Sequence, residues 1–492
     1  MATCCCVCTS ASDTHRKAYR EGRYSKAKAL QRLLTTSYHA KLLAVKRVVQ
    51  NRGAKTPGVD GIIWSTSQQK IEAVTTLKRR GYKIKPLKRI YIPKKNKKLR
   101  PLSIPSMTCR GQQSLHLLAL EPIAETVVDK NSYGFRPLRS TADAIQQCFN
   151  ILCKRNSAQY ILEGDIKACF DSISSKWLIN NVPMDKAMLT KWLKAGYIEK
   201  EQWHPTEQGT PQGSLISPCL LLIVLSGLET AIKKAVSDCK DNVNVCIYAD
   251  DFIVTCTTKE VLENKVKPAV AVFLEERGLL LSEEKTKITH INDGFDFLGV
   301  NIRKYNGKCI TKPAKSNVKR FLADIRETIK KYGASKTEDL ILQLNHKIRG
   351  WANHYQYVCA SQTFSYVDHE IFQAIWRWCL RRHPNKGKQW IKTKYFQQTA
   401  LRDWLFFAKV KHKGKEPTIV RLSHASKTPI KRHAKIKAEA TPYDPTYHEY
   451  LGERLKKRLK ERQSSIRPKW WLLWSETLKI KDDKLGHIKM PL

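Results

Sequence analysis

The chain has 492 residues, of which 42% are hydrophobic, and it carries 89 Lys and Arg against 44 Asp and Glu. This length exceeds what one hydrophobic core supports and predicts about three or four domains. A net charge of +45 would repel itself in a compact fold unless a polyanion neutralised it, so nucleic acid is the leading candidate partner and an anionic membrane surface the second. No segment approaches the ~20 consecutive apolar residues of a membrane-spanning helix, and the basic charge is spread over the whole chain, so no membrane partner is expected.

The 15 cysteines form no recognisable framework. Four crowd the N-terminus (Cys4, Cys5, Cys6 and Cys8), and the others are scattered singly through apolar segments without paired CxxC motifs. We therefore expect no zinc and no disulfide scaffold, but free thiols in a reducing compartment. The N-terminus lacks a secretory signal pattern, so we expect an intracellular protein, in the bacterial cytoplasm or nucleoid or in a eukaryotic organelle.

The first third of the chain predicts mainly helices around one basic hairpin. The expected elements are a basic helical extension over 1–55, strands over 88–93 and 99–104, and helices over about 110–128 and 141–153. Between the last two helices lies a turn-rich loop over 131–137.

The middle third predicts an antiparallel sheet. One strand ends at Asp165, and two apolar strands flank the turn Tyr248-Ala249-Asp250-Asp251. A Leu- and Ile-rich helix begins at Ser217. Because strands and helices alternate irregularly and the key turn is a hairpin, the fold class is predicted to be α+β.

The last third is basic and mainly helical. One amphipathic stripe recurs at intervals of three and four residues and consists of Ile341, Leu344, Ile348, Trp351, Tyr355 and Val358. Residues 401–492 hold 23 Lys and Arg against 10 Asp and Glu, a net charge of +13. This composition predicts a basic nucleic-acid-binding domain, and a solvated tail is the alternative.

Adjacent carboxylates occupy the turn between the two apolar strands. Asp250 and Asp251 repel each other, and the strands draw them toward a packed surface where unpaired charge is penalised. A divalent cation with oxygen ligands relieves this repulsion. Asp165 and the backbone carbonyl of Ile166 are candidates to complete the ligand set, so two Mg²⁺ ions and phosphoryl transfer are predicted. A purely structural Asp-Asp turn is the alternative, and it would be preferred if the turn stood alone.

Three further elements favour nucleotide chemistry at these carboxylates. Phe170, five residues after Asp165, would floor a sugar pocket and exclude a 2′-hydroxyl; core packing is its alternative role. Gln212 lies in a Gly- and Pro-rich turn that can approach a ligand closely, and its amide can bond a sugar or a base edge. Lys98 and Arg100 belong to the basic hairpin, which can fold over a triphosphate or remain a solvated turn.

These residues resemble the group II intron-encoded reverse transcriptase/maturases, especially the chloroplast-like lineage. The matching motifs, in chain order, are TPGVDG, RPLSIP, NSYGFRP, the Asp165 strand, GTPQGS, YADDFIV, SEEKT, GFDFLG, RGWANHY, RRHPNK and the TPIKRH-to-TPYD stretch. They cover roughly four-fifths of the chain, which makes a chance match negligible.

The resemblance implies a right-hand polymerase, with fingers and palm over 56–305 and a helical thumb, which doubles as the maturase X domain, over 306–400. It implies DNA synthesis from dNTPs on an RNA template and a DNA primer by the triad Asp165, Asp250 and Asp251. It also implies binding of the group II intron RNA, support of its splicing, and intron mobility by target-primed reverse transcription at a DNA target.

The resemblance also implies roles for single residues. Phe170 is the expected sugar gate, Gln212 contacts the incoming nucleotide, Lys98 and Arg100 hold its phosphates, and Lys285 matches a family lysine near the leaving pyrophosphate. RNA contacts are expected on the outer faces of the thumb helices, at Arg349, Asn353, His354, Arg381, Arg382, Lys386 and Lys388.

Two departures from the family pattern stand out. Ser214 replaces a usual glycine, a mild change expected to tighten the nucleotide pocket. No cysteine follows Cys379, so a zinc-stapled HNH endonuclease is not expected. Two alternative functions remain open at this stage: an RNA-binding splicing factor with little polymerase activity, and a domesticated reverse transcriptase that serves host defence or repair.

Overall fold

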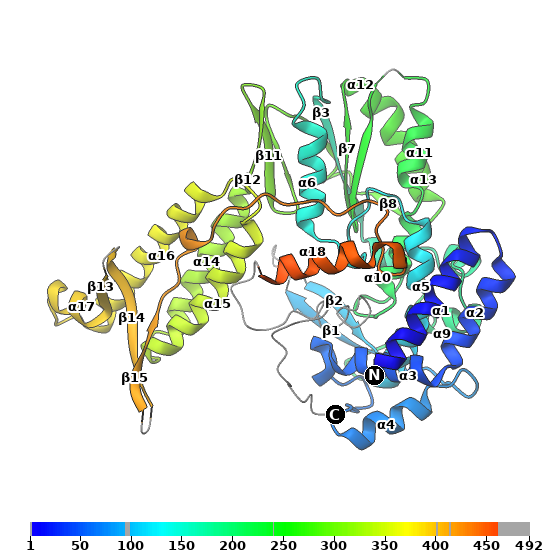
Figure 1. Cartoon of the computed structure of the whole chain (residues 1–492), viewed down its shortest axis with the longest axis horizontal. Coiled ribbons are helices and arrows are strands. Elements are labelled where there is room, and N and C mark those ends of the chain that lie inside the picture. The colour runs from blue at the N-terminus through cyan, green and yellow to red at the C-terminus, as the bar shows by residue number, and fades with distance from the viewer. Residues whose placement is uncertain (1, 94–98, 240, 400–401, 413–414, 461–492) are drawn as a thin grey trace. The chain divides into compact units, whose positions relative to one another are not determined.

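The computed structural model describes residues 2–93, 99–239, 241–399, 402–412 and 415–460 (Figure 1). These residues divide into two compact units. Unit 1 holds the described residues within 2–144, 158–288 and 436–460, and unit 2 holds those within 145–157 and 289–435. Both units combine helices with mainly antiparallel strands, so the predicted α+β class is confirmed.

The main sheet has five strands, which belong to unit 1 except that β9 crosses the boundary between the units. Its order is β6-β7-β3-β8, with β9 also pairing with β3, and the bounds are β3 Tyr160–Lys167, β6 Asn244–Tyr248, β7 Asp251–Cys256, β8 Leu280–Leu281 and β9 Lys287–His290. The β6–β7 hairpin and the β3–β7 pair are antiparallel, as predicted. Gly164 is required in β3, because a Cβ atom there would lie 2.1 Å from the Phe252 ring on β7.

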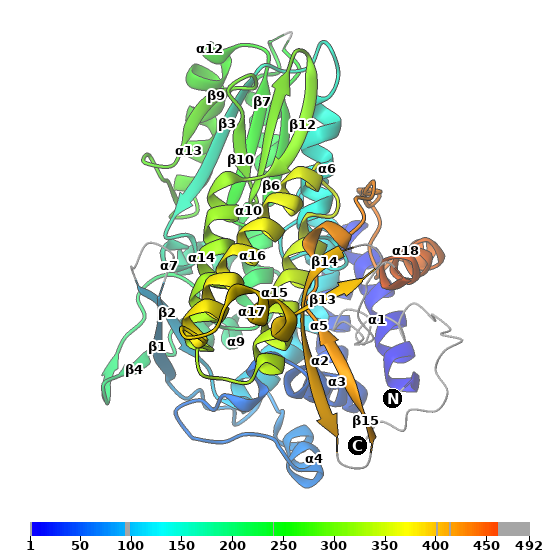
Figure 2. The same cartoon turned by 90° about the vertical axis from the view of Figure 1, so that its left-hand side faces the viewer.

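A second sheet of unit 1 contains the basic hairpin. Its order is β2-β1-β4-β5, with bounds β1 Leu87–Pro93, β2 Leu99–Ile104, β4 Tyr197–Glu199 and β5 Gln202–His204 (Figure 2). β1 and β2 pair antiparallel, which confirms the predicted hairpin, whereas β1 and β4 pair parallel. The guanidinium of Arg89 on β1 lies 3.8 Å from the centre of the Tyr197 ring on β4 and adds a cation–π contact between these strands.

The helices of unit 1 surround these sheets. They are α1 Ala2–Arg20, α2 Tyr24–Thr36, α3 Tyr38–Val49, α4 Ser67–Thr76, α5 Met107–Val127, α7 Cys169–Ser172, α8 Ser175–Asn181, α9 Lys186–Leu193, α10 Ser217–Leu225, α11 Leu228–Ala235, α12 Lys259–Val261, α13 Lys267–Glu275 and α18 His448–Lys460. A π-helical turn, Leu262–Val266, joins α12 to α13, and α6, Thr141–Leu152, crosses the boundary between the units.

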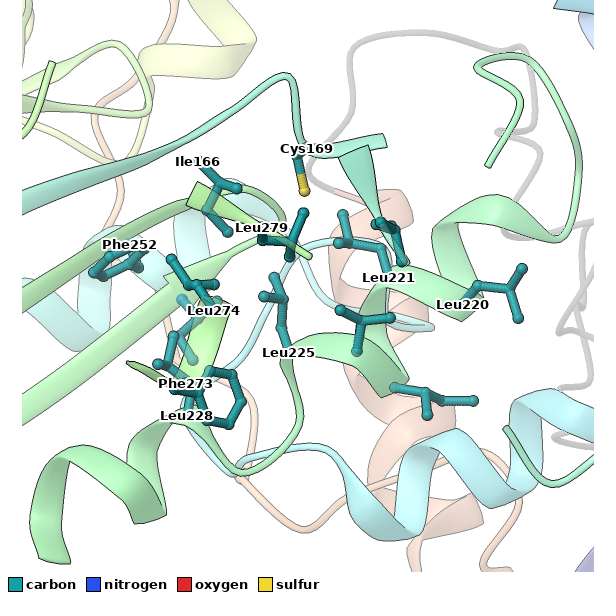
Figure 3. Packing of buried hydrophobic residues seen from close by; sticks show 14 of the residues in the cluster. Ile166, Cys169, Leu220, Leu221, Leu225, Leu228, Phe252, Phe273, Leu274 and Leu279 are labelled. Atoms are coloured by element: carbon teal, nitrogen blue, oxygen red, sulfur yellow. The ribbon is translucent and has the colours of Figure 1, made fainter. Parts of the chain in front are cut away.

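The core of unit 1 forms where α10 packs against the main sheet. Leu221 and Leu225 of α10 lie in one cluster with Phe252 of β7 and Leu274 of α13 (Figure 3). Each fully buried side chain of this kind contributes about 1.5–3 kcal/mol relative to exposure. The buried core therefore fixes the positions of β3 and β7, the strands that carry Asp165 and Asp251.

The predicted N-terminal extension is part of unit 1. Ala44 and Val48 of α3 are buried in one cluster with Leu115 and Ala119 of α5. Arg47 of α3 also pairs with Glu121 of α5 at 2.9 Å. The basic N-terminal residues therefore pack against α5, the helix that precedes the loop over 131–137.

Unit 2 contains long helices and two small sheets. The elements are β10 Phe295–Phe297, β11 Val300–Tyr305, β12 Lys308–Pro313, α14 Lys315–Lys331, α15 Thr337–Tyr355, α16 Ser361–Arg382, α17 Lys388–Tyr395, β13 Phe396–Thr399, β14 Arg402–His412 and β15 Lys415–Arg421. The predicted apolar stripe is confirmed within α15, where Leu344, Ile348 and Tyr355 are buried. Val358 is buried as well, but α15 ends at Tyr355, three residues earlier.

The region predicted as one C-terminal domain, 401–492, is divided by the structure. Its described residues up to Lys435 belong to unit 2, whereas those from Ile436 onward belong to unit 1. Among the described residues, helices long and apolar enough to cross a membrane are absent.

Candidate active site

Two of the three predicted catalytic carboxylates lie opposite each other on neighbouring strands of the main sheet. In the β3–β7 register Asp165 pairs directly with Asp251, and antiparallel partners have Cα atoms about 4.5–5.5 Å apart. Tyr248 pairs with Asp251 across the hairpin, so Ala249 and Asp250 alone make the turn. Ala249 has a left-handed φ of +58°, which permits this tight two-residue connection.

Partial burial and neighbouring negative charge raise the pKa values of Asp250 and Asp251. Protein atoms around the turn exclude water from part of the Asp251 carboxylate, and together with the charges of Asp250 and Asp165 this raises the pKa of Asp251 to about 6. The Asp251 side chain keeps contact with solvent, so the burial that raises its pKa is only partial. Partial burial and the Asp165 charge also raise the pKa of Asp250.

One lysine offsets this repulsion. Lys285 Nζ lies 2.7 Å from an Asp165 carboxylate oxygen, and this hydrogen bond raises the pKa of the lysine. Lys285 also lowers the pKa values of Asp250 and Asp251 against the effects that raise them. The predicted pyrophosphate-side lysine therefore lies at the carboxylates, paired with one of them.

The donor set suits a hard divalent cation. In the part of the chain that the structure describes, no three His, Cys, Asp or Glu side chains are close enough to form a ready metal cluster. However, Asp165, Asp250 and Asp251 supply oxygen ligands with unfavourable mutual charge, which a divalent cation would relieve. Ile166, whose carbonyl was predicted as a further ligand, pairs with Leu281 at the end of β3.

A loop that the sequence analysis left without a role supports the Tyr248–Asp251 turn. The amide of Tyr133 donates to the carbonyl of Ile247 at 2.9 Å, and the amide of Ile247 donates to Asn131 at 3.0 Å. A Cβ atom on Gly134 would lie 2.2 Å from the backbone nitrogen of Ala249. This glycine is the sequence signal for the close approach of two backbones.

Phe170 and Gln212 are brought together by backbone contacts. Thr210, two residues before Gln212, donates its amide to the carbonyl of Phe170 at 2.6 Å. The ring of Phe170 is half-buried and meets the exposed ring of Phe135 edge to face, with 6.1 Å between centroids. The predicted sugar gate and nucleotide contact thus belong to one local structure.

The side chain of Gln212 is held by a residue that sequence reasoning missed. Its amide donates to a carboxylate oxygen of Asp171 at 2.8 Å. Both residues line a cavity of about 270 Å³ whose wall also includes Arg89 and Tyr197. Asp171 directly follows Phe170, and this adjacency was the available signal.

The basic hairpin is described only in part. Lys98 lies outside the described residues, whereas Arg100 on β2 pairs with Ile92 and is exposed. The charge of Arg100 lowers the pKa of Asp250 against the effect of burial, so this guanidinium lies within electrostatic reach of the turn.

Ser214 serves a structural contact. Its buried hydroxyl donates to the amide oxygen of Gln113 on α5 at 2.9 Å, and the backbone amide of Leu215 donates to the same oxygen at 3.1 Å. The hydroxyl thus ties the GTPQGS loop to α5, and the expected tightening of the nucleotide pocket remains a prediction.

The predicted RNA contacts lie in unit 2, on α15, α16 and the turn after α16. Four of them are exposed: Arg349, His354, Arg381 and Lys386. Lys388, predicted with them, is also exposed at the start of α17. Asn353 is half-buried. Arg382 is half-buried and donates to the carbonyl of Ser335 at 2.6 Å, so its guanidinium also has a structural role.

Comparisons with known proteins agree with these motifs. The model for "Reverse transcriptase (RNA-dependent DNA polymerase)" matches residues 92–302, the group II intron maturase-specific domain matches 318–396, and the N-terminal domain of reverse transcriptase matches 15–77. Protein YkfC of Escherichia coli is 33% identical over 314 residues, which cover 55% of this chain and 82% of YkfC. The chain belongs to the group II intron-encoded reverse transcriptase/maturase family. The family predicted from the sequence motifs is therefore confirmed.

Other relatives are similar over comparable lengths. The group II intron-encoded protein LtrA of Lactococcus lactis is 29% identical over 409 residues, covering 64% of this chain and 68% of LtrA. A solved telomerase structure from Candida albicans, in complex with a telomeric RNA fragment, is 12% identical over 63% of this chain and 65% of that chain, with a TM-score of 0.38. This structural similarity is too low to support a functional argument.

Proposed function

We propose that this reverse transcriptase/maturase copies RNA into DNA at Asp165, Asp250 and Asp251. The observation that carries the proposal is the direct pairing of Asp165 with Asp251 on neighbouring strands, with Asp250 in the adjoining turn. When bound, two Mg²⁺ ions would supply the positive charge that activates the attacking primer oxygen and stabilises the leaving pyrophosphate. Asp165, Asp250, Asp251 and the carbonyl of Ile166 are the groups that would hold them.

The remaining nucleotide contacts follow from the same site. Phe170 would exclude a ribose 2′-hydroxyl, and Gln212, oriented by Asp171, would contact the incoming dNTP. Arg100, together with Lys98, would hold the triphosphate. Lys285 can leave Asp165 for the pyrophosphate, because its ammonium is mostly exposed.

The maturase role is proposed on charge and domain content. The maturase-specific domain supports an RNA partner, and we propose that this partner is a group II intron RNA whose splicing and mobility the chain promotes inside the cell. Priming at a DNA target would then supply the 3′ end that the polymerase site extends. The exposed basic residues of unit 2 would bind this RNA mainly through phosphate contacts.

The test is primer extension by the purified full chain on an RNA template with dNTPs and Mg²⁺, alongside a splicing assay on the intron RNA. The parent is expected to make DNA and to promote splicing, and the Asp250→Asn/Asp251→Asn variant only to promote splicing. Asp238→Asn is the matched control, because Asp238 is an exposed carboxylate of unit 1 that pairs with Lys265. A parent that promotes splicing but makes no DNA would identify a splicing factor instead.

A further inference from the structure

One phenylalanine of the loop over 131–137 is exposed in a strained backbone conformation. Phe135 has a left-handed φ of +59°, which bulky side chains rarely adopt. It is also 46% exposed, whereas the three residues on either side of it are all buried. An exposed apolar ring gains little from folding, and the left-handed backbone adds a cost that glycine or asparagine would avoid. Strained residues of this kind persist where their surroundings fix them, and they gather at functional sites.

Contacts on both sides of Phe135 fix its backbone. The preceding residue, Gly134, approaches the Tyr248–Asp251 turn so closely that a Cβ atom on it would lie 2.2 Å from the backbone nitrogen of Ala249. The following residue, Arg136, is buried and donates two hydrogen bonds to the buried carboxylate of Glu125, at 2.8 and 3.0 Å. Phe135 therefore cannot relax to an ordinary φ without disturbing either the turn or a buried ion pair.

The ring of Phe135 meets the ring of Phe170 edge to face. Their centroids are 6.1 Å apart and their planes differ by 67°, an arrangement that is favourable for two aromatic rings. Phe170 is half-buried and packs against the main core cluster of unit 1. Its carbonyl accepts a hydrogen bond from the amide of Thr210 at 2.6 Å, so its backbone is fixed as well. Phe135 is not one of the residues of that cluster, and it gives the Phe170 ring a second support.

We propose that Phe135 is a positioning residue for nucleotide selection, which holds the Phe170 ring where it excludes a ribose 2′-hydroxyl. The inference rests on the proposed function, in which Phe170 is the sugar gate. A gate that works by steric exclusion discriminates only while its ring stays in place, because the two sugars differ by one small group. Without the Phe135 ring, Phe170 can turn toward the vacated space and admit the hydroxyl. Deoxynucleotides need less room, so their incorporation should change less.

The test measures selectivity, defined as kcat/KM for a dNTP divided by kcat/KM for the matching rNTP, in the full chain with primer, RNA template and Mg²⁺. This ratio is independent of the fraction of active enzyme, so a variant that only folds less well leaves it unchanged. Phe135→Ala removes the ring, and Phe135→Tyr keeps it. Tyr38→Ala is the matched control, because Tyr38 is an aromatic residue of α3 in unit 1 that is 58% exposed.

Phe170→Ala is expected to lower selectivity about 100-fold and Phe135→Ala about 10-fold, mainly through faster incorporation of the rNTP. The Phe135→Ala/Phe170→Ala double variant should match Phe170→Ala within about twofold, because both residues act through one ring. Phe135→Tyr and Tyr38→Ala should keep the selectivity of the parent within about twofold.

Parent-like selectivity in Phe135→Ala, beside a loss in Phe170→Ala, overturns the inference and leaves the proposed gate intact. Losses of the two single variants that multiply in the double variant overturn it as well, because Phe135 would then act independently of Phe170. Parent-like selectivity in Phe170→Ala contradicts the proposed gate and with it this inference. A parent that makes no DNA contradicts the proposed polymerase itself, and both inferences fall together.

Discussion

The catalytic turn of unit 1 and the basic helices of unit 2 use charge in opposite ways. At the turn, Asp165 and Asp251 are fixed opposite each other by strand register, and Lys285 approaches to 2.7 Å. In unit 2, Arg381 and Lys386 extend into solvent around the end of α16. The first arrangement depends on the position of each group, whereas the second depends on the summed charge.

This difference predicts which substitutions should strongly reduce activity and which should only weaken RNA affinity. Phosphoryl transfer needs charges aligned with reacting atoms, so the loss or displacement of one group removes most of the activity. Phosphate binding draws on many exposed cations, so the loss of one weakens affinity slightly.

The largest effect is expected from Asp165→Asn. The substitution keeps the shape of the side chain but removes the charge that faces Asp251, so kcat for DNA synthesis should fall about 1,000-fold or more. Affinity for RNA should stay within about twofold, because phosphate binding draws on many exposed cations and Asp165 is not one of them. Single-turnover incorporation and filter binding on one preparation measure both quantities, and a parallel loss of RNA affinity would remove the contrast between the units.

A smaller loss is expected from Gly134→Ala. The added methyl group would lie 2.2 Å from the backbone of Ala249, so the loop or the turn has to move, and kcat should fall about 100-fold. Gly350→Ala on α15 is the matched control, because nothing lies within 4 Å of the added atom. Equal activity of the two variants would show that the loop does not position the turn.

Acid should destabilise unit 1 through a buried histidine. His116 on α5 packs edge to face on Trp192 at 5.3 Å, and burial lowers its pKa to about 4; Asp185 raises this pKa and Arg79 lowers it, both by less than burial does. The unfolded chain, with a histidine pKa of about 6.5, therefore binds a proton that the folded chain excludes between about pH 6.5 and 4. The free energy of unfolding therefore decreases as the pH falls from about 6.5 to about 4.

Between pH 7 and pH 5, the free energy of unfolding of His116→Gln should fall by about 2 kcal/mol less than that of the parent. Urea unfolding at both pH values measures the difference, and His369→Gln serves as a control, because His369 is an exposed residue of unit 2. If His116→Gln and the parent lose equal stability between pH 7 and pH 5, the burial argument is wrong.

The smallest effect is expected from Arg381→Ala. The loss of one exposed guanidinium should weaken RNA binding about threefold and reduce the slope of log K against log salt by about 1. Arg326→Ala should change the slope less, because Arg326 already pairs with Glu370 at 2.5 Å. A tenfold or greater loss of RNA affinity in Arg381→Ala would indicate a specific contact in unit 2. It would contradict the view that RNA binding there depends on the summed charge.

The turn that carries Asp250 and Asp251 could be predicted from the sequence because a hairpin is a local structure. A two-residue turn between apolar strands implies a hairpin, and a strand ending at Asp165 was predicted, although β3 continues to Lys167. The basic hairpin β1–β2 was predicted for the same reason. Short-range patterns of this kind are visible along the chain before any tertiary contact is known.

The supporting contacts depend on residues far apart in sequence and could not be predicted in this way. Asp143 pairs with Arg454 across 311 residues, and Tyr133 bonds to Ile247 from a separate loop. Charge composition predicted a nucleic-acid-binding domain over 401–492 without showing the buried pair of Asp143 and Arg454, because an arginine that pairs with a buried carboxylate looks the same in sequence as one that binds phosphate. Arg382 shows the same ambiguity, since it donates to the carbonyl of Ser335.

The most direct test of the central claim is the number of divalent ions bound at the carboxylates. Mn²⁺ can be titrated into the full chain with primer–template and a non-hydrolysable dNTP, and the bound ions counted by electron paramagnetic resonance. We predict two ions in the parent and in Asp238→Asn, and a loss of both in Asp250→Asn/Asp251→Asn. Equal occupancy in the parent and the double variant would contradict a metal-dependent polymerase site at these carboxylates.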